Sequence, residues 1–268
     1  MSYLAHRRKW FDADALAFLD AASISDSTIR NATTQLVINL KDAGLWTKMA
    51  AIYPLVGGTA TTHKWNLKDP RDLDAAFRLA FSGGFTHSST GVLPNGTTGY
   101  ASTYLIPDTS LTAESMSLGY YSRSDTNTAT DQIDLGVTDA VDFLWLSPQY
   151  DSGGFVDRFL ARNSSVSVLA DTANADARGF YLCSKTSNAA STFKTYKNGG
   201  VEATNTGSGD NPATYDLMLF AYNNSGLDRF HTNRECAFAS IGDGLTDTES
   251  LAMYNAVQAF QTTLSRQV

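Results

Sequence analysis

The hydrophobic positions near the start of the chain recur with a helical period. Residues 12–22 and 26–43 predict two short helices, the second with Ile29, Leu36 and Leu40 on one apolar face. Gly44 follows where a helix end favours a residue with positive φ. An apolar run over 46–58 then ends in paired glycines, so we place a boundary there, with 1–58 as a helical N-terminal segment and 59–268 as the main domain.

Beyond this boundary the pattern changes from helical spacing to alternation. Turn residues recur about every ten positions, and the segments between them are rich in aromatic and branched residues, as half-buried strands are. Asn198 and Gly199, followed by Gly200, form the strongest hairpin signal, because these residues tolerate positive φ. The expected strands cover residues 77–81, 116–122, 141–146, 178–184, 192–197 and 215–222.

The C-terminal segment returns to a helical pattern. Thr246 and Glu249 have the spacing of a capping box, and Leu251, Val257 and Phe260 follow on one face. Strands without interleaved helices favour an antiparallel sandwich over a parallel sheet. The expected fold is therefore mainly β, an antiparallel jelly-roll sandwich with an N-terminal helical segment and a C-terminal helix.

Composition narrows the possible partners. The 20 Lys and Arg against 27 Asp and Glu give a net charge of −7, which disfavours binding to nucleic acid. No apolar run reaches the roughly 20 residues that a bilayer span requires, and no signal peptide is visible, so we expect synthesis in the cytoplasm without membrane insertion. Cys183 and Cys236 lack the spacing of a metal site, and we expect both to be buried.

The sequence offers little catalytic machinery, and we do not expect an enzyme. The chain has four Glu residues, and Asp131 and Asp134 lie three apart, which on a strand points them to opposite faces. A glycoside hydrolase, which needs two converging carboxylates, is the least favoured alternative, with Asp134 and Glu235 as the residues to test. The GxSxG and HExxH motifs are absent.

Two kinds of binding site remain as hypotheses. Asp125, Asn127 and Asp131 are candidate calcium ligands, although a solvated turn has the same composition, so we expect no cofactor, with calcium as the exception. Carbohydrate binding requires exposed rings that stack on sugar C–H faces. We expect Trp145 to be buried in the core. The candidate aromatic residues that would stack on a ligand are Trp65, Tyr150 and Phe155.

Short motifs resemble those of the concanavalin A-like (laminin-G/pentraxin) jelly-roll superfamily. Residues 94–100 (PNGTTGY) followed by 110–112 resemble its opening motif, and 196–200 (YKNGG) its hairpin. Residues 238–254 resemble its closing motif, although 234–238 (RECAF) departs from the usual pattern. The resemblance implies a jelly roll over roughly 75–256, of a kind that often holds calcium in its loops.

Four further stretches, 44–49, 53–58, 63–74 and 259–268, resemble a family of tailed-bacteriophage virion proteins from tails, fibres or head decorations. This resemblance implies a virion structural protein and a homo-oligomer. Residues 10–58 would attach it to other virion proteins, and the displayed jelly roll would contact the host or a host-surface glycan. A purely architectural capsid or tail subunit is the alternative.

Overall fold

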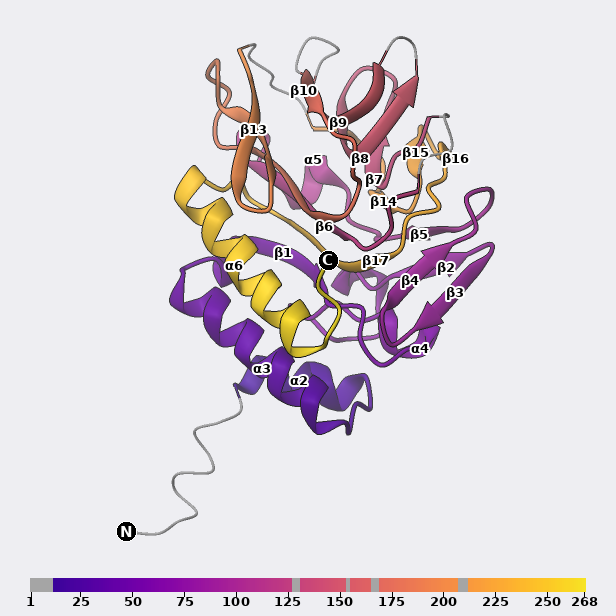
Figure 1. Ribbon diagram of the computed structural model, residues 1–268, viewed down its shortest axis with the longest axis vertical. Helices are drawn as coiled ribbons and strands as arrows, with labels where there is room; N and C mark the ends of the chain where they lie inside the picture. The colour runs from indigo at the N-terminus through magenta and orange to yellow at the C-terminus, as the bar shows by residue number, and fades with distance from the viewer. Residues whose placement is uncertain (1–11, 127–130, 153–154, 165–168, 207–211) are drawn as a thin grey trace.

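Helices and two β-sheets stack in three layers (Figure 1). The computed structural model describes residues 12–126, 131–152, 155–164, 169–206 and 212–268. Helices α2 (Ala13–Ala21), α3 (Ser27–Asp42) and α6 (Asp247–Thr263) cover the outer face of the first sheet, and the second sheet packs against its inner face. Short helical turns are η1 (Trp46–Lys48), α4 (Ala60–His63), η2 (Asp74–Ala76) and α5 (Pro107–Ser110).

The first sheet has eight strands in antiparallel pairs. Its order is β13 (Gly200–Asn205), β12 (Phe193–Lys197), β11 (Gly179–Lys185), β6 (Met116–Ser122), β17 (Cys236–Gly242), β4 (Gly91–Pro94) and β3 (Phe85–Ser88), with β1 (Met49–Tyr53) also paired with β17.

The second sheet has nine strands and forms the other layer of the sandwich. Its order is β10 (Leu169–Ala173), β9 (Phe155–Ser164), β8 (Phe143–Ser152), β7 (Leu135–Thr138), β14 (Met218–Leu219), β5 (Tyr100–Ser102) and β2 (Ala80–Ser82). A hairpin of β15 (Tyr222–Asn224) and β16 (Leu227–Arg229) joins it through a parallel pairing of β15 with β7.

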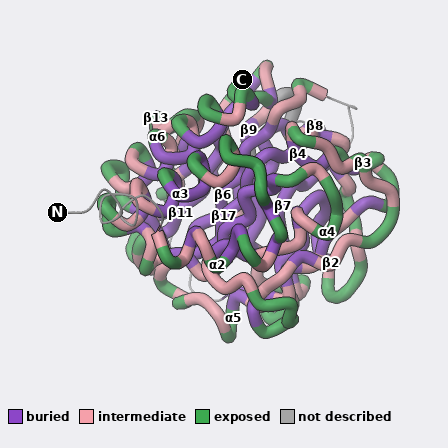
Figure 2. The backbone as a smooth tube through the Cα atoms, turned by 90° about the horizontal axis from the view of Figure 1, so that it is seen from below, coloured by how far each residue is buried: buried purple, intermediate pink, exposed green. Residues whose placement is uncertain are grey.

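The central strands of the first sheet are buried on both faces (Figure 2). On β6, Leu118 and Tyr120 enter the core between the sheets, whereas Tyr121 packs toward the helices. Phe180 and Phe238 of the neighbouring strands also face the helices. The alternation of side chains along a strand thus supplies two separate cores.

The predicted antiparallel sandwich and its three main helices are confirmed. Asp12 and Asp26 cap α2 and α3, and Leu36 and Leu40 of the predicted stripe are buried. Thr246 and Glu249 form the reciprocal capping box of α6. The strands predicted at 116–122, 178–184 and 192–197 coincide with β6, β11 and β12, and that at 141–146 overlaps the start of β8.

Two predicted strands are wrong in extent because of single residues with positive φ. Phe77, with φ of 58°, ends the η2 turn, so the segment 77–81 contributes only to the short β2. Phe220, with φ of 70°, interrupts the segment 215–222 and separates β14 from β15. The hairpin turn is confirmed, with φ of 50° at Asn198 and 81° at Gly199.

Residues on both sides of position 58 share one packing arrangement. β1 lies beside β17 with Tyr53 opposite Ala239, and α3 packs against α6. The core between the first sheet and the helices contains Leu36 from the N-terminal segment together with Phe238 from the sandwich. The assignment of 1–58 as an attachment segment stays a prediction about its role.

Burial explains the state of the two thiols. Cys183 and Cys236 are both fully buried and free, as predicted. Burial raises the pKa of the Cys183 thiol to about 12, so it stays protonated and unreactive. In the part of the chain that the structure describes, no helix is long and apolar enough to cross a bilayer.

Candidate functional site

An aromatic pocket of about 320 Å³ lies on the outer face of the second sheet. Strands β7, β8 and β9 form its floor, and the β15–β16 hairpin with the residues that follow it forms one wall. The pocket is lined by Ile133, Thr138, Ala140, Phe143, Trp145, Tyr150, Arg162, Tyr222, Asn224 and Phe230.

The alternation of β8 divides its side chains between the sandwich core and this pocket. Leu144 and Leu146 point into the core, so Phe143 and Trp145 lie on the outer face. The Trp145 side chain sits above Gly136 of β7, where an added Cβ atom would lie 2.4 Å from Trp145 Cβ. Glycine at 136 is therefore what allows Trp145 to lie this close to β7.

A β-bulge places Tyr150 on the same face as Trp145, although the two residues are an odd number of positions apart. The register of β8 against β9 shifts between Ser147 and Tyr150, where β8 uses one residue more than its partner. A bulge of this kind reverses the facing of all the residues that follow it. The rings of Trp145 and Tyr150 consequently pack together, with centroids 5.7 Å apart.

The opposite wall presents a stacked pair of rings. Tyr222 and Phe230 have centroids 5.9 Å apart and planes inclined by 26°. Phe230 has a φ of 54°, a conformation that bulky residues rarely adopt, and its ring is 37% exposed. Burial raises the pKa of the Tyr222 phenol, which therefore stays protonated and can donate a hydrogen bond.

The pocket lining also contains three polar side chains beside the aromatic rings. Arg162 lies opposite Trp145 on β9, and its guanidinium carbon is 4.9 Å from the centroid of Phe143. Thr138 and Asn224 add a hydroxyl and an amide to the lining. A site of this composition offers stacking surfaces together with a small number of hydrogen-bonding groups.

The structure brings only part of the predicted ring set together. Tyr150 lies in the pocket. Trp65 instead packs against the core between the first sheet and the helices, with the Lys64 ammonium 4.6 Å from the Trp65 ring centroid. Phe155 lies in β9 opposite Ser152, and its side chain is outside the described part of the structure.

Sequence reasoning missed most of the pocket. Trp145 is buried as predicted, 4% exposed, but it belongs to a small cluster outside the sandwich core, a position that the alternation of Leu144 and Leu146 already signals. Tyr222, Phe230 and Arg162 come from distant segments, and only the tertiary fold places them here.

The calcium candidates do not form a recognisable metal site. Asp125 accepts a hydrogen bond from the backbone N–H of Ala177, which fits a loop-closing role. Asn127 lies outside the described residues. Among the side chains that the structure does describe, including Asp131, no group of three or more His, Cys, Asp or Glu could hold a metal ion.

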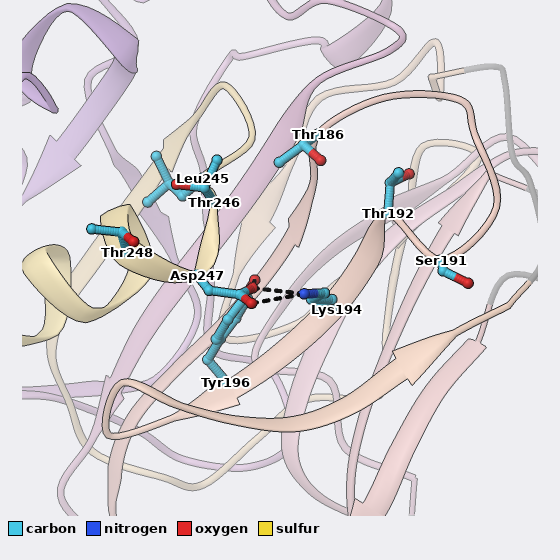
Figure 3. A pocket seen from close by; sticks show the side chains of 9 residues that line it. All are labelled: Thr186, Ser191, Thr192, Lys194, Tyr196, Leu245, Thr246, Asp247 and Thr248. Carbon is cyan, nitrogen blue, oxygen red and sulfur yellow. Dashed lines mark hydrogen bonds and ion pairs between the residues drawn. The ribbon is translucent and has the colours of Figure 1, made fainter.

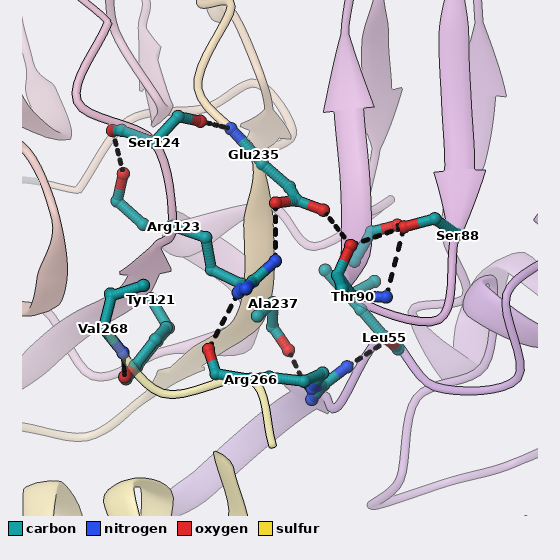
Figure 4. Close-up of polar contacts among 12 residues, drawn as sticks. Leu55, Ser88, Thr90, Tyr121, Arg123, Ser124, Glu235, Ala237, Arg266 and Val268 are labelled. Carbon is teal, nitrogen blue, oxygen red and sulfur yellow. Dashed lines mark hydrogen bonds and ion pairs between the residues drawn. The ribbon is translucent and has the colours of Figure 1, made fainter. Parts of the chain in front are cut away.

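The two carboxylates considered for hydrolysis are each held in an ion pair. Asp134 is fully buried and receives two hydrogen bonds from the Arg234 guanidinium, at 3.1 and 2.8 Å. Glu235 accepts from Arg123 Nη1 at 2.8 Å and from the Thr90 hydroxyl (Figure 4). Both carboxylates therefore connect segments of the fold.

A second, polar pocket of about 330 Å³ lies between β12 and the start of α6 (Figure 3). The Lys194 ammonium and the Tyr196 hydroxyl both donate to Asp247, at 2.8 and 2.9 Å. The Tyr196 ring is buried, so this pocket has hydroxyls but presents no stacking surface. Its ion pair joins the helix to the sheet edge.

Comparison with known proteins gives a fold but no family. No family model matches the chain, and no curated protein matches it. The binding domain of botulinum neurotoxin serotype D/C is 12% identical with a TM-score of 0.50, over 80% of this chain and 53% of that one. The chain thus spans about half the length of that domain.

Two other solved structures give lower scores. Domain 4 of AbnA, a GH43 extracellular arabinanase from Geobacillus stearothermophilus in complex with arabinotriose, is 16% identical, with a TM-score of 0.47 over 77% of this chain and 98% of that domain. The NanB sialidase from Streptococcus pneumoniae is 14% identical, with a TM-score of 0.43 over 53% of this chain and 24% of that one. The topology and the toxin domain together establish a β-sandwich of the jelly-roll class.

Proposed function

We propose that this protein is a carbohydrate-contacting module and that the aromatic pocket on the second sheet is its binding site. The observation that carries the proposal is the outward-facing group of rings around Trp145, with Tyr150 and Phe230 at its rim. Rings of this kind stack on the apolar faces of sugars, while Arg162 and Asn224 offer hydrogen bonds to hydroxyl groups.

A binding role is preferred to a catalytic one because of the carboxylates. A glycoside hydrolase needs two carboxyl groups facing the scissile bond. None of the lining residues that the structure describes carries a carboxylate, and Asp134 and Glu235 are held by Arg234 and Arg123.

The virion setting suggested by the sequence remains part of the proposal. In this setting residues 10–58 contact other virion proteins and the outer face of the second sheet is directed to the host surface. Helices α2 and α3 lie on the far side of the sandwich from the aromatic pocket, an arrangement compatible with attachment at one side and display at the other. Homo-oligomer formation likewise stays a prediction.

The test combines a glycan array with single substitutions in the pocket. Phe230→Ala and Tyr150→Ala should each weaken binding of a glycan hit by roughly tenfold, about 1.4 kcal/mol, since each removes one stacking surface. Tyr215→Ala is the matched control, because Tyr215 is 39% exposed, as much as Phe230, but does not line the pocket. Absence of any hit on host-surface and polysaccharide arrays would contradict the proposal.

A further inference from the structure

Two arginines of β9 lie on the same outer face but in different electrostatic environments. Arg158 is opposite Tyr150, and its guanidinium donates to Asp171 of β10 at 2.7 Å. Arg162 is opposite Trp145, and no carboxylate among the described side chains forms an ion pair with it. The Nε atoms of both arginines are buried and have no hydrogen-bond partner in the described structure, so the two side chains differ in their ion pairing.

The described lining of the pocket offers this guanidinium no negative charge. The ten lining residues that the structure describes include one basic side chain, Arg162, and no acidic one. Asp139, in the turn beside Thr138, does not line the pocket, and its carboxylate accepts from Val141 N, Asp142 N and the Thr214 hydroxyl. A chain with a net charge of −7 therefore keeps an uncompensated positive group inside an aromatic pocket.

A buried donor without a protein partner takes one from water or a ligand, and in Arg162 the charge of the guanidinium also lacks a described carboxylate. Guanidinium groups match carboxylates well because the two planar groups can form paired hydrogen bonds. The cation is held against the Phe143 ring at 4.9 Å, which fixes its position relative to the Tyr150 and Phe230 rings of the pocket.

We infer that the sugar bound in the aromatic pocket is acidic, with its carboxylate on Arg162 and its ring face on the aromatic side chains. The inference rests on the proposed function and specifies its ligand class. Uronic acids and sialic acids both carry this group, and the pocket chemistry is common to the two.

Calorimetric titration of the full chain tests the inference with five probes. These are methyl glucuronide, its methyl ester, methyl glucoside, the methyl glycoside of N-acetylneuraminic acid and the methyl ester of that glycoside. We expect at least one free acid to bind about tenfold or more tightly than its uncharged counterpart, since the ester and the glucoside lack the charged acceptor. The acid that binds identifies the source of the carboxylate.

Substitutions then locate the effect. Arg162→Gln should abolish the preference for the acid, so that the acid, its ester and the neutral sugar bind to the variant with affinities within about twofold of one another. Arg158→Gln removes one positive charge from the same face of the same strand and is the matched control. It should retain the preference, because Asp171 already compensates Arg158.

The possible outcomes separate the inference from the proposed function. Equal binding of acid, ester and glucoside would overturn the acidic-sugar inference and leave the carbohydrate module intact. Binding of none of the probes, with no hit on the array, would overturn both. If Arg162→Gln does not fold, the comparison of acid with ester on the unaltered protein still decides the question.

Discussion

At the scale of single residues, two imidazoles meet in the interior near α4. His63 Nε2 accepts the backbone N–H of Gly58 at 3.1 Å, so its proton must lie on Nδ1, which is 3.0 Å from His87 Nδ1. The His63 ring is 1% exposed. Burial, with the nearby charges of His87 and Arg266, lowers the pKa of His63 to about 3.

This pair predicts a loss of stability on acidification. Between the unfolded pKa of about 6.5 and the folded pKa of about 3, the unfolded chain binds a proton that folded His63 does not. The free energy of unfolding should therefore fall with decreasing pH in this window, by up to about 1.4 kcal/mol per pH unit. Burial also lowers the pKa of His87, which acts in the same direction.

Urea unfolding between pH 7 and pH 4.5 measures the effect, with His63→Gln as the comparison. The amide of glutamine can still accept from Gly58, and it does not titrate. The variant should show a flatter dependence on pH than the unaltered protein. Identical slopes would mean that His63 has the same pKa in the folded and the unfolded chain, which would contradict the prediction.

Residue identity alone predicted burial better than it predicted contacts. Cys183, Cys236 and Trp145 are buried as expected from their side chains. That Asp134 is neutralised by Arg234 was not visible, because the two residues are a hundred positions apart and meet only in the folded chain.

At the scale of elements, the last residues of the chain fasten α6 to the sandwich. The buried Arg266 guanidinium donates to the backbone oxygens of Leu55 and Ala237 (Figure 4). It also donates to the backbone oxygen of Pro54 and to Gln261 Oε1. One side chain thus joins the end of α6, the segment after β1 and strand β17.

Arg266→Met should lower the free energy of unfolding by roughly 2–4 kcal/mol, because it leaves several buried oxygens without a donor. Denaturant unfolding followed by circular dichroism measures the change. Arg178→Met is the control, since Arg178 is half-exposed and pairs with Asp176 at the surface; it should change stability by less than about 0.5 kcal/mol. A similar loss in both variants would contradict the fastening role.

The helices could be predicted and the irregular strands could not, for a physical reason. A helix can be predicted from the local spacing of its apolar residues and from its capping residues, as at Thr246 and Glu249. The breaks at Phe77 and Phe220 depend on positive φ values, which tertiary packing imposes on residues that seldom adopt them. The bulge in β8 differs, because Pro148 lies within the shifted segment and proline inside a strand is a local signal for a bulge.

At the scale of the whole molecule, the N-terminal helices protect an apolar face of the first sheet. Tyr121, Phe180 and Phe238 on this face pack beneath α2, α3 and α6. We expect a chain beginning at residue 59 to lose cooperative thermal unfolding and to aggregate, because it lacks β1 and exposes part of this surface.

Circular dichroism and light scattering on the full and shortened chains measure this outcome. The full chain should melt in one transition and scatter as a single species of defined mass. A shortened chain that melts as cooperatively as the full one would show that 1–58 is a separate unit, as the boundary predicted from sequence implies. The sandwich class was thus predictable from alternation, whereas the sharing of a core across residue 58 was not.

The bulge in β8 gives the aromatic pocket an unusual dependence on chain length. Inserting one residue into β9 opposite the bulge would give the extra residue of β8 a partner, restore a regular register and turn the Tyr150 ring through the sheet toward the sandwich interior, because Trp145 and Tyr150 are five positions apart. A related chain could therefore keep every ring of the pocket in its sequence and still lack the site. Evolution can gain or lose this surface by the insertion or removal of a single codon, with no substitution at all.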